Sequence, residues 1–216
     1  MSALASAARI GAEALVQPRQ ACARLQSAPP AICILALAGV LQAALAAVQW
    51  RIASPVLERD PLFADWSVAS STGTVLQILM VTAAPATLAA RALLLGSVLD
   101  AVSAGTARRV WVAWAACAES VLWLEAAATT AVAGFANPVD LAALRAARLH
   151  SGLDLLWPHA PGGAWLAGIN LFTVWWAVLL AMGMLHLGGT SRRRAIGIGI
   201  ACGLSRVALQ ALWNFW

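Results

Sequence analysis

Five stretches of predominantly apolar residues alternate with shorter polar segments along the chain. A helix needs roughly 20 apolar residues to cross a bilayer, because the hydrocarbon core is about 30 Å thick and a helix rises about 1.5 Å per residue. The predicted spans are residues 31–50, 72–95, 110–134, 164–186 and 195–213. We therefore predict an all-α, polytopic membrane bundle of five transmembrane helices, with a lead-in at residues 1–30 and a single membrane domain at 31–216.

Two segments outside the spans have the apolar spacing of amphipathic helices. Residues 18–30 begin with Pro18, a residue favoured in the first helical turn, and three apolar side chains follow on one face. These are Ala21, Cys22 and Leu25. We expect either an interfacial helix on the inner leaflet or a solvated lead-in to the first span. Residues 137–156, in the second external loop, begin with Asn-Pro and predict another short amphipathic helix.

The basic residues, all of them arginine, predict the orientation of the bundle, because cytoplasmic loops retain arginine and lysine. With the N-terminus in the cytoplasm, the cytoplasmic segments contain Arg9, Arg19, Arg24, Arg108, Arg109, Arg192, Arg193 and Arg194. The external loops contain Arg51, Arg59, Arg145 and Arg148. This imbalance predicts a cytoplasmic N-terminus and an external C-terminus.

The composition indicates a membrane protein and gives no sign of a cofactor. Of the 216 residues, 62% are hydrophobic and 11% are charged, which is far more apolar than a soluble domain. The formal charge of +5 is scattered between apolar segments, so no basic stripe predicts nucleic-acid binding. The four cysteines and three histidines lack the spacing of metal ligands. No nucleotide-binding, HExxH or nucleophile motif occurs, and we expect no cofactor, no metal and no catalytic residue.

Four arginine and glutamate residues fall inside the predicted spans, where an unpaired charge costs about 2.5 to 3.5 kcal/mol on insertion scales. Arg91 is roughly 10 Å and Glu119 roughly 15 Å from the cytoplasmic ends of antiparallel neighbouring spans, so their side chains can meet. Glu125 points about 120° away from Glu119 around the same helix, which makes Arg206 its candidate partner. We predict an intramembrane network of these four residues. Three interpretations of this network stay open: structural pairing, a proton or substrate path, and protonated glutamates.

Glycines in the last two predicted spans favour close helix packing, because small residues let helices approach each other in lipid. Gly199 and Gly203 have GxxxG spacing, and Gly183 lies late in the preceding span. We expect these glycines to pack helices within the chain, with a homodimer contact as the alternative.

The most distinctive stretch is the hairpin of the last two predicted spans, NLFTVWWAVLLAMGMLHLGGTSRRRAI. It combines the aromatic residues Phe172 and Trp175 with a late glycine, a short turn containing Ser191, and Arg194 followed by Ala195. In this pattern, and in the order of spans and loops, the chain resembles the bacterial branch of the Yip-domain family, named for Ypt/Rab-interacting proteins. The resemblance implies a five-helix bacterial inner-membrane protein without cofactor or established catalytic residues.

These features predict a non-enzymatic scaffold or accessory subunit of a membrane assembly. Its expected partners are membrane lipids and another integral membrane protein or a second copy of the chain, and not nucleic acid. One alternative is a small transporter component that uses the arginine–glutamate network. A second is an intramembrane enzyme acting on a lipid-linked substrate.

Overall fold

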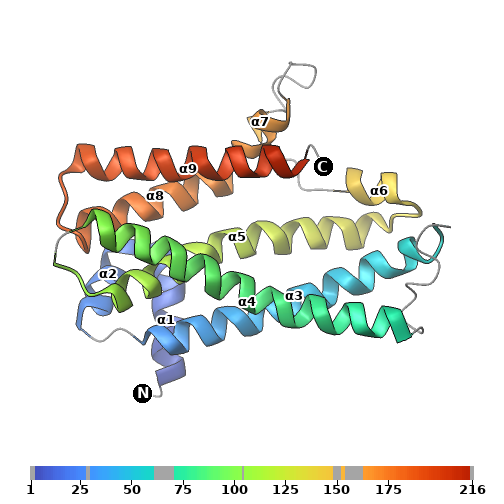
Figure 1. Cartoon of the computed structure of the whole chain (residues 1–216), viewed down its shortest axis with the longest axis horizontal. Helices are drawn as coiled ribbons and strands as arrows, with labels where there is room; N and C mark the ends of the chain where they lie inside the picture. The colour runs from blue at the N-terminus through green and yellow to red at the C-terminus, as the bar shows by residue number, and fades with distance from the viewer. Residues whose placement is uncertain are drawn as a thin grey trace. The chain divides into compact units, whose positions relative to one another are not determined.

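The computed structural model describes residues 3–27, 30–60, 71–103, 105–147, 152–153 and 163–214. These residues are mostly helical and contain no β-strand, although Gly152 and Asn170 form an isolated antiparallel bridge. The helices are α1 (Ala3–Val16), α2 (Pro18–Ser27), α3 (Ala31–Leu57), α4 (Ser71–Val102), α5 (Arg108–Ala136), α6 (Leu141–Ala146), α7 (Gly163–Gly168), α8 (Leu171–His186) and α9 (Arg192–Asn214) (Figure 1). The prediction of an all-α fold is confirmed for this part of the chain.

Within the described part of the chain, three helices are long and apolar enough to cross a membrane, which is typical of a membrane protein. They cover Ala31–Leu57, Thr72–Val102 and Arg108–Ala136, and each contains one of the first three predicted spans. Each is also longer than its predicted span, with 27, 31 and 29 residues. The apolar helix α8 is shorter, with 16 residues.

The stretch predicted as one helix at 164–186 is interrupted in the structure. Helix α7 ends at Gly168, and α8 begins after Asn170. The side-chain oxygen of Asn170 accepts a hydrogen bond of 2.8 Å from the backbone N–H of Thr173. Asparagine in this position caps the first turn of a helix, so a new helix starts here although the sequence on both sides is apolar.

The chain divides into two compact units, which we describe separately. Unit 1 comprises residues Met1–Leu37, Arg91–Leu122 and His150–Trp216, and unit 2 comprises Ala38–Ala90 and Trp123–Leu149. Each of the long helices α3, α4 and α5 therefore has one part in unit 1 and the other part in unit 2.

The core of unit 1 is built around the first part of α5, where every residue from Val110 to Ala118 is buried. Trp111 and Trp114 are completely buried, and α8 packs Leu180 and Met184 into the same cluster. The Trp114 indole N–H also donates a hydrogen bond of 3.1 Å to the backbone carbonyl of Leu179 in α8. Helix α5 is thus held to α8 by a specific polar contact as well as by packing.

Helices α8 and α9 form a close antiparallel hairpin (Figure 1). A Cβ atom built on Gly199 would lie 2.7 Å from the carbonyl oxygen of Ala177, and one on Gly203 would lie 3.3 Å from the Ala177 Cβ. In the turn, the Thr190 hydroxyl donates a hydrogen bond of 2.8 Å to the carbonyl of Met184. The two glycines therefore occupy a contact within the hairpin.

The N-terminal helices α1 and α2 pack against each other, and α2 also contacts α8. Ala21, Cys22 and Leu25 of α2 are at most 1% exposed and belong to the core of unit 1. The apolar face expected to rest on the inner leaflet is therefore turned into the protein, because α1 and α8 cover it. Burial raises the pKa of the Cys22 thiol to about 12, so that side chain stays neutral near pH 7.

In unit 2, polar bonds join the remaining parts of the long helices. The Gln49 side-chain amide of α3 donates a hydrogen bond of 3.0 Å to the Thr130 hydroxyl of α5. The Trp123 indole donates one of 3.1 Å to the carbonyl of Leu41. A Cβ atom on Gly39 would lie 3.2 Å from the Cβ of Pro85, so α3 and α4 approach closely there.

The amphipathic helix predicted at 137–156 is represented by the short α6, which is capped by Asp140 rather than begun by Asn-Pro. The Asp140 carboxylate accepts a hydrogen bond of 2.7 Å from the backbone N–H of Ala143. Residues 148–151 and 154–156 of that predicted helix lie outside the described residues, as do residues 61–70 of the first external loop.

Candidate functional site

Unit 1 contains an ion pair between Arg91 of α4 and Glu119 of α5. Arg91 Nη1 lies 3.7 Å from Glu119 Oε2, a separation too long for a direct hydrogen bond. The Glu119 side chain is 5% exposed and that of Arg91 is 52% exposed. The carboxylate is therefore enclosed by the protein, while the guanidinium group of Arg91 still reaches the surface of the unit.

A second guanidinium group, that of Arg206 in α9, belongs to the same region. Its Cζ atom lies 6.0 Å from the ring centroid of Trp176, within the range of a cation–π contact. Its Nε donates a long hydrogen bond of 3.4 Å to the Thr173 hydroxyl. Both partners come from successive turns of α8 and are buried, at 7% and 3% exposed.

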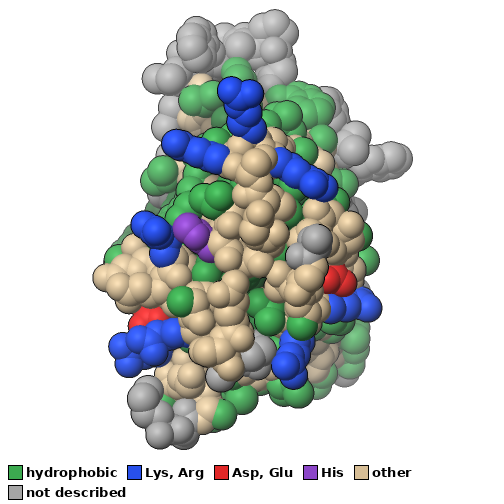
Figure 2. Space-filling model, turned by 90° about the vertical axis from the view of Figure 1, so that its left-hand side faces the viewer, with side chains coloured by type: hydrophobic (Ala, Val, Ile, Leu, Met, Phe, Trp, Pro, Cys, Tyr) green, Lys and Arg blue, Asp and Glu red, His purple; other side chains and the backbone are tan. Residues whose placement is uncertain are grey.

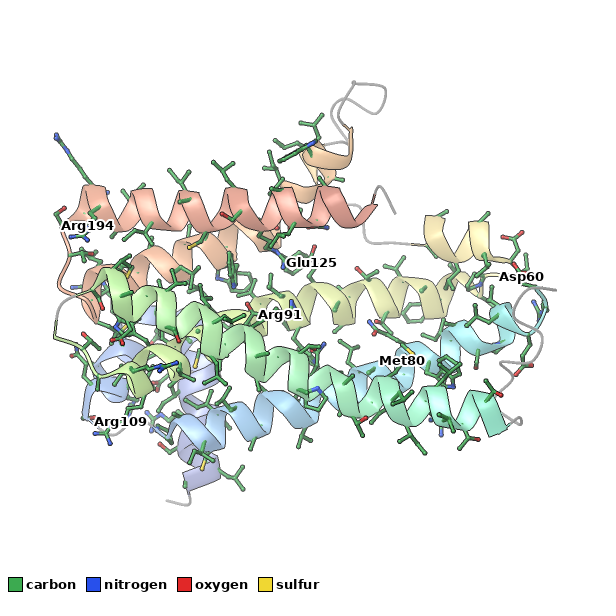
Figure 3. The ribbon with its side chains drawn as sticks, in the orientation of Figure 1. Asp60, Met80, Arg91, Arg109, Glu125 and Arg194 are labelled. Carbon is green, nitrogen blue, oxygen red and sulfur yellow. The ribbon has the colours of Figure 1, made fainter. Side chains whose placement is uncertain are left out.

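These residues line a groove of about 750 Å³ in unit 1. Arg91 and Glu119 lie in its wall together with Trp176, Arg206 and Gln210. The rest of the wall is largely apolar and comes from α4 and α9: Leu95, Val98, Val102, Ile198, Ala201, Cys202, Ser205 and Leu209. Figure 3 labels Arg91 part of the way along α4, away from the helix end at Val102.

The fourth member of the predicted network, Glu125, lies in unit 2 and is not among the described residues that line this groove. The structure therefore brings Arg91, Glu119 and Arg206 together within one unit. The pairing of Glu125 with Arg206 stays a prediction.

The residues of the distinctive hairpin motif have different surroundings in unit 1. Phe172 and Trp175 are partly buried and pack against the core. Ser191 is exposed in the turn, and Ala195 is 2% exposed. The guanidinium group of Arg194 donates a hydrogen bond of 3.1 Å to the carbonyl of Val102, the last residue of α4. The motif thus ties the start of α9 to the end of α4.

Arginines gather at the end of unit 1 where α4 ends and α5 and α9 begin. Arg109 and Arg194 are labelled there in Figure 3, and Figure 2 shows arginine side chains around this face of the molecule. The exposed arginines of the adjoining segments are Arg9, Arg19, Arg24, Arg108, Arg109, Arg192, Arg193 and Arg194. A polar pocket of about 370 Å³, lined by Gln26, Thr106 and Arg109 among others, opens between the two loops at this end.

Sequence reasoning missed Thr173 and Trp176 as contacts of Arg206. Their spacing of one helical turn was a visible signal, because residues three apart lie on the same face of a helix. Which helix that face meets depends on the rotation of α8, and periodicity does not give this rotation. Within the described residues, no group of three or more His, Cys, Asp or Glu side chains could hold a metal ion.

Comparison with known proteins does not add a family to this picture. No family model matches the chain, and neither a curated protein nor a solved structure matches it. The functional argument therefore depends on the groove and on the charges in its wall.

Proposed function

We propose that the protein is a five-span, multi-pass inner-membrane protein of Yip-domain type. It acts without catalysis, as a scaffold or accessory subunit that binds another membrane component. The observation that carries this proposal is the groove of unit 1, in which a buried, paired carboxylate lies in a largely apolar wall. Such a surface suits a ligand that arrives from the lipid phase, because the ligand exchanges its apolar contacts with lipid for apolar contacts with the groove wall.

The distribution of arginine supports an orientation with the N-terminus in the cytoplasm. Both α5 and α9 begin with consecutive arginines, and the N-terminal helices add further arginines to the same unit. Cytoplasmic loops retain such residues. In this arrangement α8 and α9 are the fourth and fifth spans, and the groove faces lipid between α4 and α9.

The composition of the groove wall favours binding over transport. A path for an ion or a polar solute needs polar groups along its length. Here the wall from Leu95 to Val102 on α4 is apolar, as is Ile198 on α9. Of the two glutamates of the predicted network, the described groove reaches Glu119 alone.

The same wall gives little support to an intramembrane enzyme. The Ser205 hydroxyl donates a hydrogen bond of 2.9 Å to the carbonyl of Ala201 in its own helix. No histidine occurs among the described residues that line the groove, so neither Ser205 nor Cys202 has a neighbouring imidazole there to act as its base.

A photo-crosslinking amino acid at Val98 would test the proposal in native membranes. Val98 is 54% exposed and lines the groove, whereas Val75 is equally exposed on α4 but lies in unit 2. We expect a discrete adduct from position 98 and none of the same mass from position 75. Flux of protons or solute through purified protein in liposomes, abolished by Glu119→Gln, would instead identify a transporter. Reporter fusions in the loops and at the C-terminus would test the five spans and their orientation.

A further inference from the structure

We propose that the groove of unit 1 is a binding site for a single-chain anionic amphiphile, a lipid with one hydrocarbon chain and a carboxylate or phosphate group. This inference rests on the proposed function, because it names the kind of membrane component that the groove holds. It is carried by the charges at one part of the groove, the apolar walls beside them and the size of the space.

The charged part of the groove is suited to an anion. Two guanidinium groups and one carboxylate line it, and the carboxylate is enclosed behind the ion pair. Arg91 is half exposed, and the 3.7 Å contact with Glu119 is its one ion pair among the described residues. A guanidinium group carries five N–H donors in a plane, so Arg91 retains donors that an oxyanion can accept. Carboxylates and phosphates are the groups that match this fork.

The apolar part of the groove is suited to a hydrocarbon chain. On α4 it runs from Leu95 through Val98 to Val102, and Ile198 and Ala201 of α9 face the same space. At about 1.5 Å per residue, the stretch of α4 from Arg91 to Val102 is about 16 Å long. A chain extended along these walls from Arg91 toward Val102 would place its acidic end at Arg91 and Arg206, inside the predicted span, where the two guanidinium groups supply the countercharge that hydrocarbon lacks.

The size of the groove suits a single hydrocarbon chain. Its volume is about 750 Å³, which lies within the range of about 300 to 1,000 Å³ that is typical of small-molecule sites. A lipid with one chain is a ligand of this size class.

Trp176 gives the site a rigid wall beside the charges. Its ring is 7% exposed and contacts the guanidinium group of Arg206 at 6.0 Å. This contact orients Arg206 in the groove, as does its hydrogen bond to Thr173. An anionic group placed there meets a cation whose position is already restricted, which lowers the entropic cost of binding.

The test measures binding to the purified full-length chain in nanodiscs of uncharged phosphatidylcholine. Oleate supplies the carboxylate, lysophosphatidate supplies the phosphate, and monoolein is the neutral single-chain control. Native mass spectrometry counts bound molecules, and ligand-induced thermal stabilisation gives a second readout. We expect one molecule of the oleate or lysophosphatidate probe per chain, bound about tenfold or more tightly than monoolein, as expected for a charge-assisted contact. The stronger of the two anionic probes identifies the headgroup.

Matched variants distinguish the loss of the binding site from a loss of folding. Val98→Trp fills the apolar wall and should abolish binding, whereas Val75→Trp, at an equally exposed position of the same helix, should not. The paired change Arg91→Gln with Glu119→Gln removes the cation without leaving a lone buried charge, and it should also lower the affinity for the anionic probe. Arg206→Gln should lower it further.

Equal binding of monoolein, or anionic binding that survives Val98→Trp, would overturn the inference. So would saturable binding of an acidic transmembrane peptide by a protein that takes up neither anionic probe. A crosslinked adduct at Val98 without amphiphile binding would refute this inference and leave the proposed function standing. Solute flux in liposomes would refute the proposed function itself.

Discussion

The indole ring of Trp114 lies so close to Gly183 that no other residue fits at position 183. A Cβ atom built on Gly183 would lie 2.1 Å from the Trp114 Nε1 and 2.5 Å from its Cδ1. The same Nε1 donates a hydrogen bond to the carbonyl of Leu179, one turn earlier in α8. Because Trp114 is completely buried, the ring has no space into which it can withdraw.

Gly183→Ala should therefore destabilise the protein strongly. The clash requires the ring or α8 to shift, and such overpacking costs about 1 to 3 kcal/mol. The gain of about 1 kcal/mol from alanine in a helix does not offset the upper part of this range. Thermal unfolding in detergent, followed by tryptophan fluorescence, measures the loss. An unchanged unfolding temperature would show that Trp114 does not lie against Gly183.

Two glycines of α9 provide a matched pair for testing the α8–α9 contact. A Cβ atom on Gly199 would lie 2.7 Å from the Ala177 carbonyl oxygen, whereas one on Gly197 meets nothing within 4 Å. We expect Gly199→Ala to lower the unfolding temperature and Gly197→Ala to leave it unchanged or raise it slightly, since alanine is the better helix former. Equal effects of the two changes would contradict the close approach of α9 to α8. If Gly199 served a contact between two copies of the chain, its change would alter the oligomeric state with little effect on the monomer.

The pair formed by Arg91 and Glu119 can be tested by a double-mutant cycle. Glu119→Gln and Arg91→Gln should each lower the thermal stability of the solubilised protein, and Arg91→Gln more so, because it leaves a buried carboxylate without its cation. The double change should recover part of the loss, with a coupling energy of about 0.5 to 3 kcal/mol. Strictly additive losses would mean that the two side chains do not interact. Arg193→Gln, which changes an exposed arginine outside the groove, serves as the control for loss of charge.

The contact between α1 and α2 should weaken in acid. The Arg9 Nε donates a hydrogen bond of 2.8 Å to Glu13 Oε1, and Arg24 Nε lies 2.7 Å from Glu13 Oε2. The hydrogen bond from Arg9 contributes most, and the positive charge of Arg24 adds to it, so the pKa of Glu13 lies below its ordinary value of 4.5. Because this pKa is depressed in the folded state, the stabilisation is complete above about pH 4.5 and is lost as the pH falls through the folded-state value.

The separation of α1 from α2 can be measured as the distance between two labels, one at exposed Ala12 and one at exposed Ala23. The labels are attached through non-canonical amino acids. We expect a short distance at pH 7 and a longer or broader one near pH 3. In Glu13→Gln the distribution should be broad at both values. A distribution that narrows in acid would contradict the sign of the effect.

The long helices and one of the charge contacts could be predicted from the sequence, because they depend on length and depth alone. Residues 31–50 and 110–134 are apolar over the thickness of a bilayer, and the structure contains a helix around each. Arg91 and Glu119 were expected at similar depths in antiparallel helices, and their side chains lie 3.7 Å apart. Depth is a property of each segment, so no knowledge of its neighbours is needed.

Contacts that depend on the rotation of a helix could not be predicted in this way. The amphipathic pattern of α2 is the same whether its apolar face meets lipid or protein, and only the fold shows that Leu25 packs inside unit 1. The contact of Arg206 with Trp176 likewise depends on which face α8 turns toward α9. The break before α8 was missed because the single polar residue Asn170 stands within a long apolar stretch, where hydrophobicity outweighs the capping signal.

The packing of α2 against α8 sets an order for the maturation of the chain. The Gln26 side-chain amide donates a hydrogen bond of 3.1 Å to the carbonyl of His186, so this contact of α2 forms only after residue 186 has been synthesised. Ribosomes add about 5 to 20 residues per second, so at least roughly 8 to 30 seconds separate the synthesis of these two segments. Throughout this interval the apolar face of α2 lacks its partner from α8. The apolar face of nascent α2 must therefore be covered for a time by the membrane surface or a chaperone, a need that ends once α8 has packed against it.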